Sequence, residues 1–189
     1  MNKVIALLIA ICMFTSVNAQ EVKKVAGFNV AFGAKAGLNF ATVYGNVSDP
    51  SLLVGVHFGG MAELTINKQL AVQPEILFSM QGSSYSKKGN TQLNYLLLPV
   101  IGKYYIIENL SLEAGPHLGL LLSARDGGEN LKKHVSATDV GFNIGAGYKL
   151  KNKINFGLRY SIGLTNINND SSNKINNAVL QLSVGYFFM

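Results

Sequence analysis

The sequence of 189 residues is poor in cysteine, tryptophan and charge. Its single cysteine stands at position 12, so we expect neither a disulfide framework nor thiolate chemistry in the rest of the chain. Charged residues make up 14% of the chain, against roughly 25% in a typical soluble domain. After the N-terminal stretch, no segment stays apolar for the roughly 18 residues that indicate a membrane-spanning helix. The sequence therefore fits neither a typical soluble domain nor a helical membrane protein.

The charges that are present have a small positive balance, with a formal net charge of +6. The basic residues are scattered along the chain instead of gathering into one patch. This distribution indicates solubility and some attraction to anionic lipid, and we expect no nucleic-acid partner.

The N-terminus has the three parts of a secretory signal peptide. Met1-Asn2-Lys3 is the positive start, Val4 to Val17 is an apolar run, and Val17-Asn18-Ala19 is a small-residue cleavage site. A buried helix is the alternative for this segment, but its position and flanks favour export. We expect residues 1–19 to be a signal peptide that is removed, and residues 20–189 to form one domain.

A strict two-residue alternation predicts the secondary structure, most clearly between Asp139 and Asn166. One parity is apolar and the other carries glycine, asparagine and a few charges. The apolar positions are Val140, Phe142, Ile144, Ala146, Tyr148 and Leu150, and then Ile154, Phe156, Leu158, Tyr160, Ile162 and Leu164. Successive side chains of a strand point to opposite faces, so this stretch predicts a long two-faced hairpin with its turn at Lys151 to Lys153.

The same alternation recurs along the chain and predicts eight strands of about ten to fifteen residues, an even number of the length that a bacterial membrane barrel uses. The predicted strands are Asn29–Thr42, Leu53–Ile66, Gln69–Gly82, Gln92–Ile106, Leu110–Ala124, Thr138–Leu150, Lys153–Asn166 and Asn177–Phe188. Short turns alternate with longer polar stretches at Val43–Leu52, Ser83–Thr91, Arg125–Ala137 and Ile167–Asn176. This alternation is typical of outer-membrane barrels, with both termini on the periplasmic side.

The two faces of the predicted strands distinguish a soluble barrel from a membrane barrel. One face is apolar, and the other holds many glycines and nearly all of the mid-strand charge. The mid-strand charges are Lys35, Glu63, Glu75, Lys103, Glu113, Lys149 and Arg159. A soluble exterior needs denser charge than this polar face offers. The sequence therefore predicts an all-β fold, an eight-stranded antiparallel up-and-down transmembrane β-barrel that is apolar outside, polar inside and free of unpaired edges in lipid.

The predicted interior of this barrel is narrow. Eight strands enclose a space that side chains alone can fill, and charges removed from water need partners. We interpret the interior charges as a salt-bridged plug that sets register and rigidity. A narrow porin-like channel for small solutes, with an ion-conducting or proton-relaying lumen, is the alternative.

Few residues suggest chemistry. His57 and His117 share the polar face and would bind a metal only if they converged with Glu63 or Glu113 at one height. A lipid-modifying hydrolase, the least favoured alternative, would need an activated serine with a histidine and a carboxylate facing lipid, and no mid-strand position of the apolar face supplies them. We therefore expect no catalytic residue, no metal and no cofactor.

The longer polar connections and the strand ends offer surface features. Basic residues that could contact lipopolysaccharide phosphates are Lys87, Lys88, Arg125, Lys132 and Lys133. Aromatic residues near strand ends suggest the two interfacial girdles of a membrane barrel. These residues are Phe28, Tyr104, Tyr105, Tyr148, Phe187 and Phe188 at one rim, and Phe40, Tyr44, Tyr85, Tyr95 and Tyr160 at the other.

Four stretches resemble the PorT-type outer-membrane β-barrel family. They are Gln73–Ser79 with Gln81-Gly82, Tyr95–Ile101, Ala114–Gly119, and Asp139–Phe142 with Arg159-Tyr160. The second is the most specific, because Pro99 stands between apolar residues in mid-strand. The chain has Leu97 where that pattern usually has an acidic residue, but it keeps the lysine at Lys103, for which Glu75 or Glu113 would be the substitute partner.

The resemblance implies an integral outer-membrane barrel of a Gram-negative cell, without catalytic residues. The family namesake takes part in protein secretion, but many relatives have no assigned role, so we do not transfer that role to this chain. We expect a structural, surface-interaction or envelope and secretion-accessory role, with outer-membrane lipid, the assembly machinery that inserts such barrels and an envelope protein as the candidate partners. The C-terminal stretch Val184–Met189 resembles the aromatic terminal signal that this machinery reads, although it ends in methionine.

Overall fold

The computed structural model describes residues 23–25, 28–46, 50–85, 89–126, 129–132, 135–151, 153–167 and 174–188. Its strands are β1 Lys23–Val25, β2 Phe28–Gly45, β3 Leu53–Thr65, β4 Leu70–Tyr85, β5 Gly89–Ile107, β6 Leu110–Asp126, β7 Glu129–Asn130, β8 Thr138–Lys149, β9 Ile154–Gly163 and β10 Ile175–Phe187. Within the described ranges, no helix is long and apolar enough to cross a membrane.

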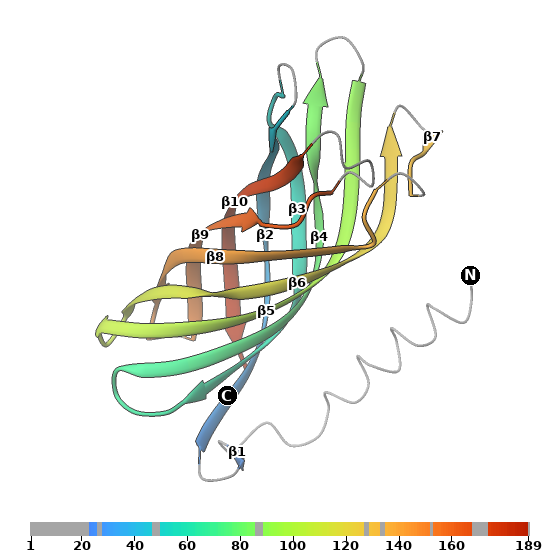
Figure 1. The fold of residues 1–189 in the computed structure, drawn as a ribbon. Helices are drawn as coiled ribbons and strands as arrows, with labels where there is room; N and C mark the ends of the chain where they lie inside the picture. Colours follow the sequence, from blue (N-terminus) through green and yellow to red (C-terminus); the bar gives the residue numbers. More distant parts are fainter. Residues whose placement is uncertain are drawn as a thin grey trace.

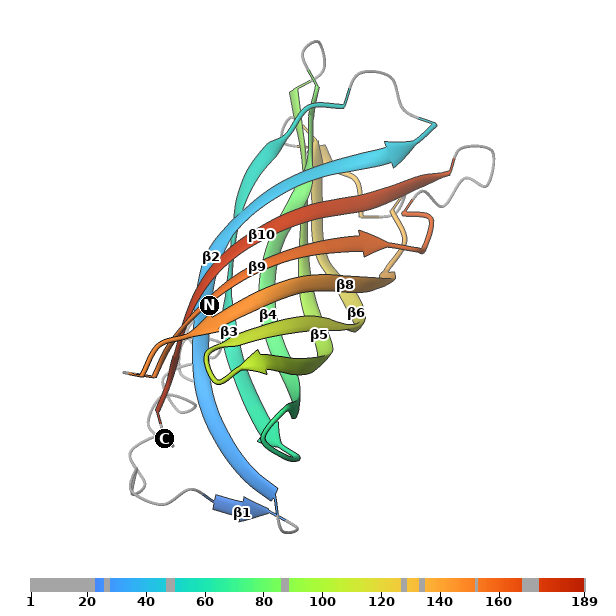
Figure 2. The same ribbon diagram turned by 90° about the vertical axis from the view of Figure 1, so that its left-hand side faces the viewer.

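The long strands pair antiparallel with their neighbours and close into a ring, in the order β2-β3-β4-β5-β6-β8-β9-β10 and back to β2 (Figures 1 and 2). The closing contacts run from Asn29↔Thr65 to Ala41↔Leu53 between β2 and β3, and from Phe187↔Gly33 to Ile175↔Gly45 between β10 and β2. The predicted eight-stranded antiparallel barrel is confirmed.

Four strands are longer than predicted. β2, β4, β5 and β6 contain 18, 16, 19 and 17 residues, whereas β3, β8, β9 and β10 contain 10 to 13. The prediction of a loop over Ser83–Thr91 was wrong, since β4 and β5 stay paired through Ser84↔Asn90 to Tyr85↔Gly89. Apolar alternation stops where the lipid stops, but backbone hydrogen bonds continue, so a rule based on alternation misses this extension.

Two short strands were not predicted either. β1 pairs with the start of β2, and β7 pairs with the end of β6. Strands of three and two residues are too short to show a period.

The connections distinguish the two ends of the barrel. Tight turns join β3 to β4, β5 to β6 and β8 to β9 at the end where the C-terminus lies (Figure 1). In the first turn, Asn67 Oδ1 accepts hydrogen bonds from the backbone N–H groups of Gln69 and Leu70, each at 2.8 Å. In the third, Lys153 takes the left-handed conformation with φ of 71°. Because membrane barrels place short turns in the periplasm, this end is the periplasmic one and the opposite end is the outer one.

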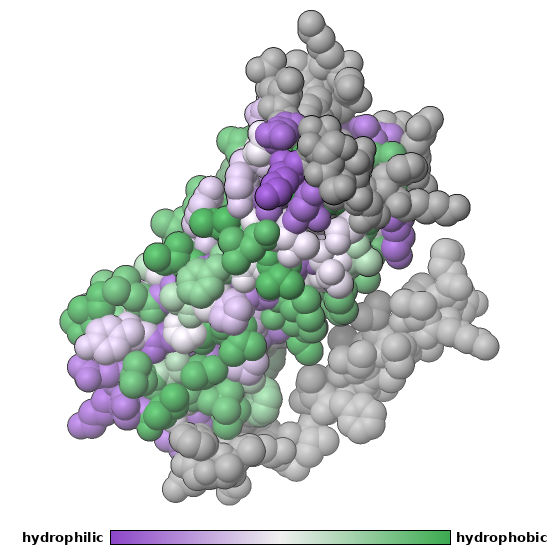
Figure 3. All heavy atoms as spheres, in the orientation of Figure 1, coloured by the Kyte–Doolittle hydropathy of each residue, from purple (hydrophilic) through white to green (hydrophobic). Residues whose placement is uncertain are grey.

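The outward face of the wall is apolar over the whole ring. Its exposed large side chains include Phe32, Leu38, Val56, Phe58, Ile76, Val100, Leu112, Leu118, Phe142, Ile144, Leu158, Leu182 and Val184. Figure 3 shows one face of this surface, which is largely green over the wall and has purple residues toward the ends of the strands. So continuous an apolar surface is far larger than a soluble monomer exposes, and lipid is the medium that matches it.

Some of the predicted rim aromatics do not face lipid. Tyr95 and Phe187 are fully buried inside the barrel, and Tyr105 directs its hydroxyl to Glu63 in the interior. Their odd-numbered positions give them the parity of the polar face. The prediction considered only that they lie near strand ends and did not use this parity. Tyr44, Tyr104, Tyr148, Tyr160 and Phe188 lie exposed on the outer surface as expected.

Candidate functional site: the barrel lumen

The periplasmic half of the lumen contains a continuous ion-pair network, and Glu75 is at its centre. Arg159 on β9 donates to both carboxylate oxygens of Glu75 on β4, at 3.0 Å each, in a bidentate pair. The same guanidinium reaches Glu113 on β6 at 3.0 Å. Lys35 on β2 adds a contact to Glu75 at 3.3 Å, and the Gln73 amide adds another at 2.6 Å.

A second part of the network lies nearer the periplasmic rim, around Glu63 on β3. Lys103 on β5 and Lys149 on β8 each approach a Glu63 oxygen at 2.9 Å, and the Tyr105 hydroxyl donates to it at 2.9 Å. Lys103 also lies 3.4 Å from Glu113, which joins the two parts. All seven predicted lumen charges therefore belong to one network. The acidic partners of Lys103 are Glu63 and Glu113, so of the two carboxylates expected beside it Glu113 is found and Glu75 is not.

Glycine makes room for these side chains. A Cβ at Gly147 on β8 would lie within 3.0 Å of the Ser111 hydroxyl and would also meet the Glu113 carboxylate. The polar parity is rich in glycine because the narrow interior has space for a charge or for a wall side chain, but not for both.

A layer of neutral polar residues lies above the ion pairs. His57 Nδ1 is 2.8 Å from the Asn39 oxygen, and the Asn39 amide donates to the Ser79 hydroxyl at 2.9 Å. His117 belongs to a separate cluster, with Nδ1 at 3.2 Å from the Asn143 amide and 3.5 Å from the Ser161 hydroxyl. Within the described residues, no three His, Cys, Asp or Glu side chains converge as metal ligands.

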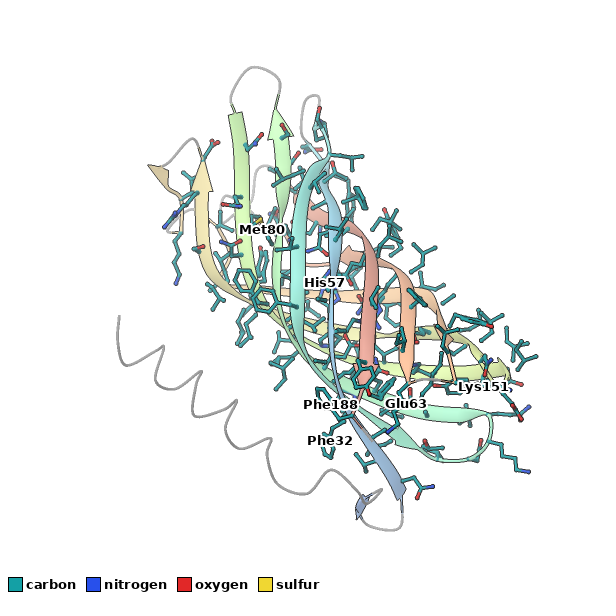
Figure 4. The ribbon with its side chains drawn as sticks, turned by 180° about the vertical axis from the view of Figure 1, so that it is seen from behind. Phe32, His57, Glu63, Met80, Lys151 and Phe188 are labelled. Carbon is teal, nitrogen blue, oxygen red and sulfur yellow. The ribbon has the colours of Figure 1, made fainter. Side chains whose placement is uncertain are left out.

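Both histidines fill space left by glycine on the neighbouring strand. A Cβ at Gly37 would lie 2.7 Å from the His57 ring, and one at Gly141 would meet the His117 ring. In Figure 4, Met80, His57 and Glu63 follow one another down the barrel, with His57 between the outer and periplasmic levels. The histidines are therefore members of the interior packing.

The outer end of the lumen contains a buried apolar cluster, which the sequence reasoning missed. The buried cluster, here called the outer cluster, consists of Val43, Leu77, Leu93, Tyr95, Leu97, Leu121, Ala124 and Ile167. Leu131 and Val135, from the segment between β7 and β8, and Ile175, at the start of β10, pack against it. Hydrogen bonds from Leu121 N to Ala137 O at 2.8 Å and from Ser136 N to Ile167 O at 2.8 Å tie the segment before β8 to β6 and to the residues after β9.

One buried carboxylate was also missed. Asp139, at the start of β8, is 1% exposed and accepts the Asn177 amide at 2.8 Å. Its other oxygen has no hydrogen-bond partner among the described residues. The available signal was its parity, because Asp139 shares the face of Gly141 and Asn143, but its place at a predicted strand end made it look like a rim residue.

Two of the predicted outer cations are described. Arg125 is exposed at the outer end of β6, and the Lys132 ammonium donates to the Leu122 carbonyl at 3.1 Å. Both flank the β6–β7 turn. Lys87, Lys88 and Lys133 lie outside the described residues, as does the predicted signal peptide.

The family assignment follows from a match of residues 18–169 to the model of the outer membrane protein beta-barrel domain. The chain belongs to this family. The match covers well over half of the chain and supports an outer-membrane location. No curated protein sequence matches the chain.

Solved outer-membrane barrels share the fold. The structure of Neisserial surface protein A superimposes with a TM-score of 0.59 at 15% identity, covering 82% of this chain and 96% of that one. The attachment invasion locus protein Ail of Yersinia pestis, in complex with the heparin analogue sucrose octasulfate, gives 0.54 at 14% identity, covering 84% and 98%. At such identities, the likeness concerns the fold alone.

Proposed function

We propose that this chain is a non-enzymatic outer-membrane barrel with a closed lumen, which acts through its outer surface. The observation that carries the proposal is that side chains fill the lumen along its length. Ion pairs from β2, β3, β4, β5, β6, β8 and β9 occupy the periplasmic half, the polar layer with His57 and His117 lies above them, and the outer cluster lies toward the other end. A hydrated solute would have to separate the bidentate Arg159–Glu75 pair and its neighbours and then pass the apolar outer cluster.

The arrangement of serine and histidine supports the non-enzymatic part of the proposal. The Ser161 hydroxyl oxygen lies 3.5 Å from His117 Nδ1, but both side chains are buried in the lumen with Asn143. A lipid-modifying site would have to face the membrane, and the lumen wall separates this pair from it.

Conductance tests the closed lumen directly. Purified, folded protein is added to a planar lipid bilayer beside a known porin. We expect no current steps from this protein over the range of voltages in which the porin conducts. Reproducible steps that change in size with Arg159→Gln would refute the closed barrel and establish the narrow-channel alternative.

The exposed cations of the β6–β7 turn suggest the first contact of this outer surface. We propose that Arg125 and Lys132 bind phosphate groups of the surrounding lipid, including lipopolysaccharide. Lys132 is anchored at the carbonyl of Leu122, the last apolar residue of β6 on the lipid face, so its ammonium lies at the height of the head groups. Loss of salt-sensitive lipid binding in a double Arg125→Gln, Lys132→Gln variant is the expected result.

The PorT-type subgroup, with a cleaved signal peptide, is the finer family proposal. Pro99 in the middle of β5, opposite His117, supports this assignment. Leu97 departs from the pattern, which usually has an acidic residue there, and its side chain belongs to the outer cluster instead. An envelope or secretion partner would follow from that subgroup. Crosslinking of the tagged protein in outer membranes, followed by purification in mild detergent, tests for a stoichiometric partner. Recovery of a solitary barrel would argue against an accessory role.

A further inference from the structure

The face of the wall that contacts lipid changes its chemistry abruptly on the extended strands. On β5, outward positions read Val100, Leu98 and Leu96, and then Asn94, Gln92 and Asn90 toward the outer end. On β6, a β-bulge beside Asn94 separates apolar Leu122 from the outward polar residues Ser123 and Arg125. We name the polar residues Ser84, Asn90, Gln92, Asn94, Ser123 and Arg125 the polar ladder.

Backbone pairing makes the polar ladder one continuous surface. Asn94 lies between Met80 and Ser123, Gln92 lies between Gly82 and Arg125, and Asn90 lies opposite Ser84. The lower members support one another, since the Asn94 amide donates to the Ser123 hydroxyl at 2.9 Å. The ladder therefore rests on paired strands and not on loops.

The upper members use only part of their hydrogen-bonding capacity within the protein. Gln92 Nε2 has the thioether sulfur of Met80 as its partner, at 2.9 Å, and a thioether is a weak acceptor. Gly82, with φ of 125°, stands beside Gln92 and has no side chain to cover it. The Asn90 oxygen accepts a hydrogen bond from the Ser84 hydroxyl at 2.7 Å, while Asn90 and Arg125 are both exposed. Amides, hydroxyls and a guanidinium on one sheet surface suit a ligand with sugar hydroxyls and phosphate groups.

The position of the ladder identifies the source of that ligand. The ladder continues the lipid-facing surface of the same strands without a break. A lipid whose chains lie against Leu96 and Leu122 must therefore place its head group at Asn94 and Gln92. Asp126, the acidic neighbour of Arg125 in the chain, has the opposite parity and pairs with Thr91, so it does not cancel the charge of Arg125 on this face.

We propose that the polar ladder is a binding site for the sugar and phosphate head group of an outer-leaflet glycolipid, namely lipopolysaccharide of the cell's own membrane. Arg125 binds a phosphate, and Gln92 with Asn90 binds sugar hydroxyls. The site rests on the proposed function, because it makes the extended wall a docking surface for the surrounding membrane. It adds sugar recognition to what would otherwise be contact with charge alone.

The test uses the full mature chain in lipid nanodiscs that contain either lipopolysaccharide or phosphatidylglycerol, which is anionic but has no sugar. After transfer into mild detergent, native mass spectrometry counts the lipid molecules that remain bound. We expect lipopolysaccharide to be retained over phosphatidylglycerol, and Gln92→Leu to reduce only lipopolysaccharide retention, up to about tenfold, as the loss of one hydrogen bond to a sugar hydroxyl predicts. Arg125→Gln should reduce retention of both lipids.

Lys153→Gln is the matched control, because it removes an exposed cation from the periplasmic turn and should change neither lipid. The shift in gel mobility on boiling verifies that every variant is folded. Equal retention of lipopolysaccharide by Gln92→Leu and the unaltered protein would overturn the proposal. So would equal retention of the two lipids, or equally tight binding of a soluble polysaccharide that has no lipid anchor. Current steps in the bilayer test would refute the closed barrel but leave this result standing, so the two failures are distinguishable.

Discussion

Replacing Glu75 by glutamine tests whether the lumen network stabilises the barrel. The Glu75 carboxylate accepts a hydrogen bond from each terminal nitrogen of Arg159, at 3.0 Å, and lies 3.3 Å from the ammonium of Lys35. Glutamine keeps the size of the side chain but removes its charge. Arg159 would then keep only Glu113 as an acidic partner, and Lys35 would lose the one carboxylate with which it forms an ion pair among the described residues.

The expected loss is large because the whole site is removed from water. The network has four basic and three acidic side chains, so one positive charge is in excess, and Glu75→Gln doubles that excess. Removal of one partner from a buried ion pair typically costs about 3–5 kcal/mol. That is a large fraction of the roughly 5–15 kcal/mol by which a domain is stable. The protein has no tryptophan, so unfolding by urea in lipid vesicles is followed by circular dichroism and by gel mobility.

Asp139→Asn is the matched control, since it is also an exchange of a buried carboxylate for an amide. Asp139 has a hydrogen bond from Asn177 at 2.8 Å but no ion pair with any described residue. Neutralising it removes the cost of burying an unpaired charge, so we expect a free energy of unfolding that is unchanged or higher by about 1 kcal/mol. Equal destabilisation by the two exchanges would refute the reasoning, because it would mean that the shape of the lumen, and not the pairing of charge, determines stability.

Three further predictions follow from the wall and the outer cluster. Gly37→Ala should destabilise the barrel by several kcal/mol, since the new Cβ would meet the backbone carbonyl of the facing strand. Gly60→Ala should be nearly neutral, because the atom closest to its new Cβ is 4.0 Å away. Thermal unfolding compares the two variants. Leu97→Glu should cost about 2 kcal/mol or more by burying an unpaired carboxylate in the outer cluster, and a folded variant of unchanged urea midpoint would contradict this. On intact cells, a membrane-impermeant maleimide should label Gln92→Cys, which lies in water, but not Leu98→Cys, which lies in lipid. Labelling of both variants would contradict a lipid boundary between these two positions.

The fold was predictable because period-two alternation records the face of every residue in a long strand. Lys35, Glu75 and Arg159 were assigned to the lumen from parity alone, and in the structure they are buried and ion-paired with one another. Their partners were not predictable. Which carboxylate meets Lys103 depends on the stagger between strands, and a single sequence does not contain that stagger.

The alternation did not predict the outer cluster either, and the reason is a different one. Leu93, Leu97 and Leu121 have the parity of the lumen charges, so a rule that assigns one parity as polar treats them as exceptions. The rule assumes that the surroundings of the wall stay constant along a strand. On β4, β5 and β6 they do not, because these strands leave the lipid and continue into water.

The two halves of β5 show how a change of solvent inverts the pattern. In the periplasmic half, Leu98 and Val100 face lipid while Lys103 faces the lumen; toward the outer end, Gln92 faces outward while Leu93 faces inward. The first arrangement satisfies a strand between lipid and a polar interior, and the second satisfies a soluble sheet that covers an apolar core. The inversion occurs within the few residues around Leu96, so one strand belongs to two kinds of protein architecture. The inward Leu93 and the polarity of the ladder are therefore two consequences of one cause, the exit of this wall from the membrane. The outer cluster itself begins lower, since Leu97 and Leu121 lie beside the lipid-facing Leu96 and Leu122.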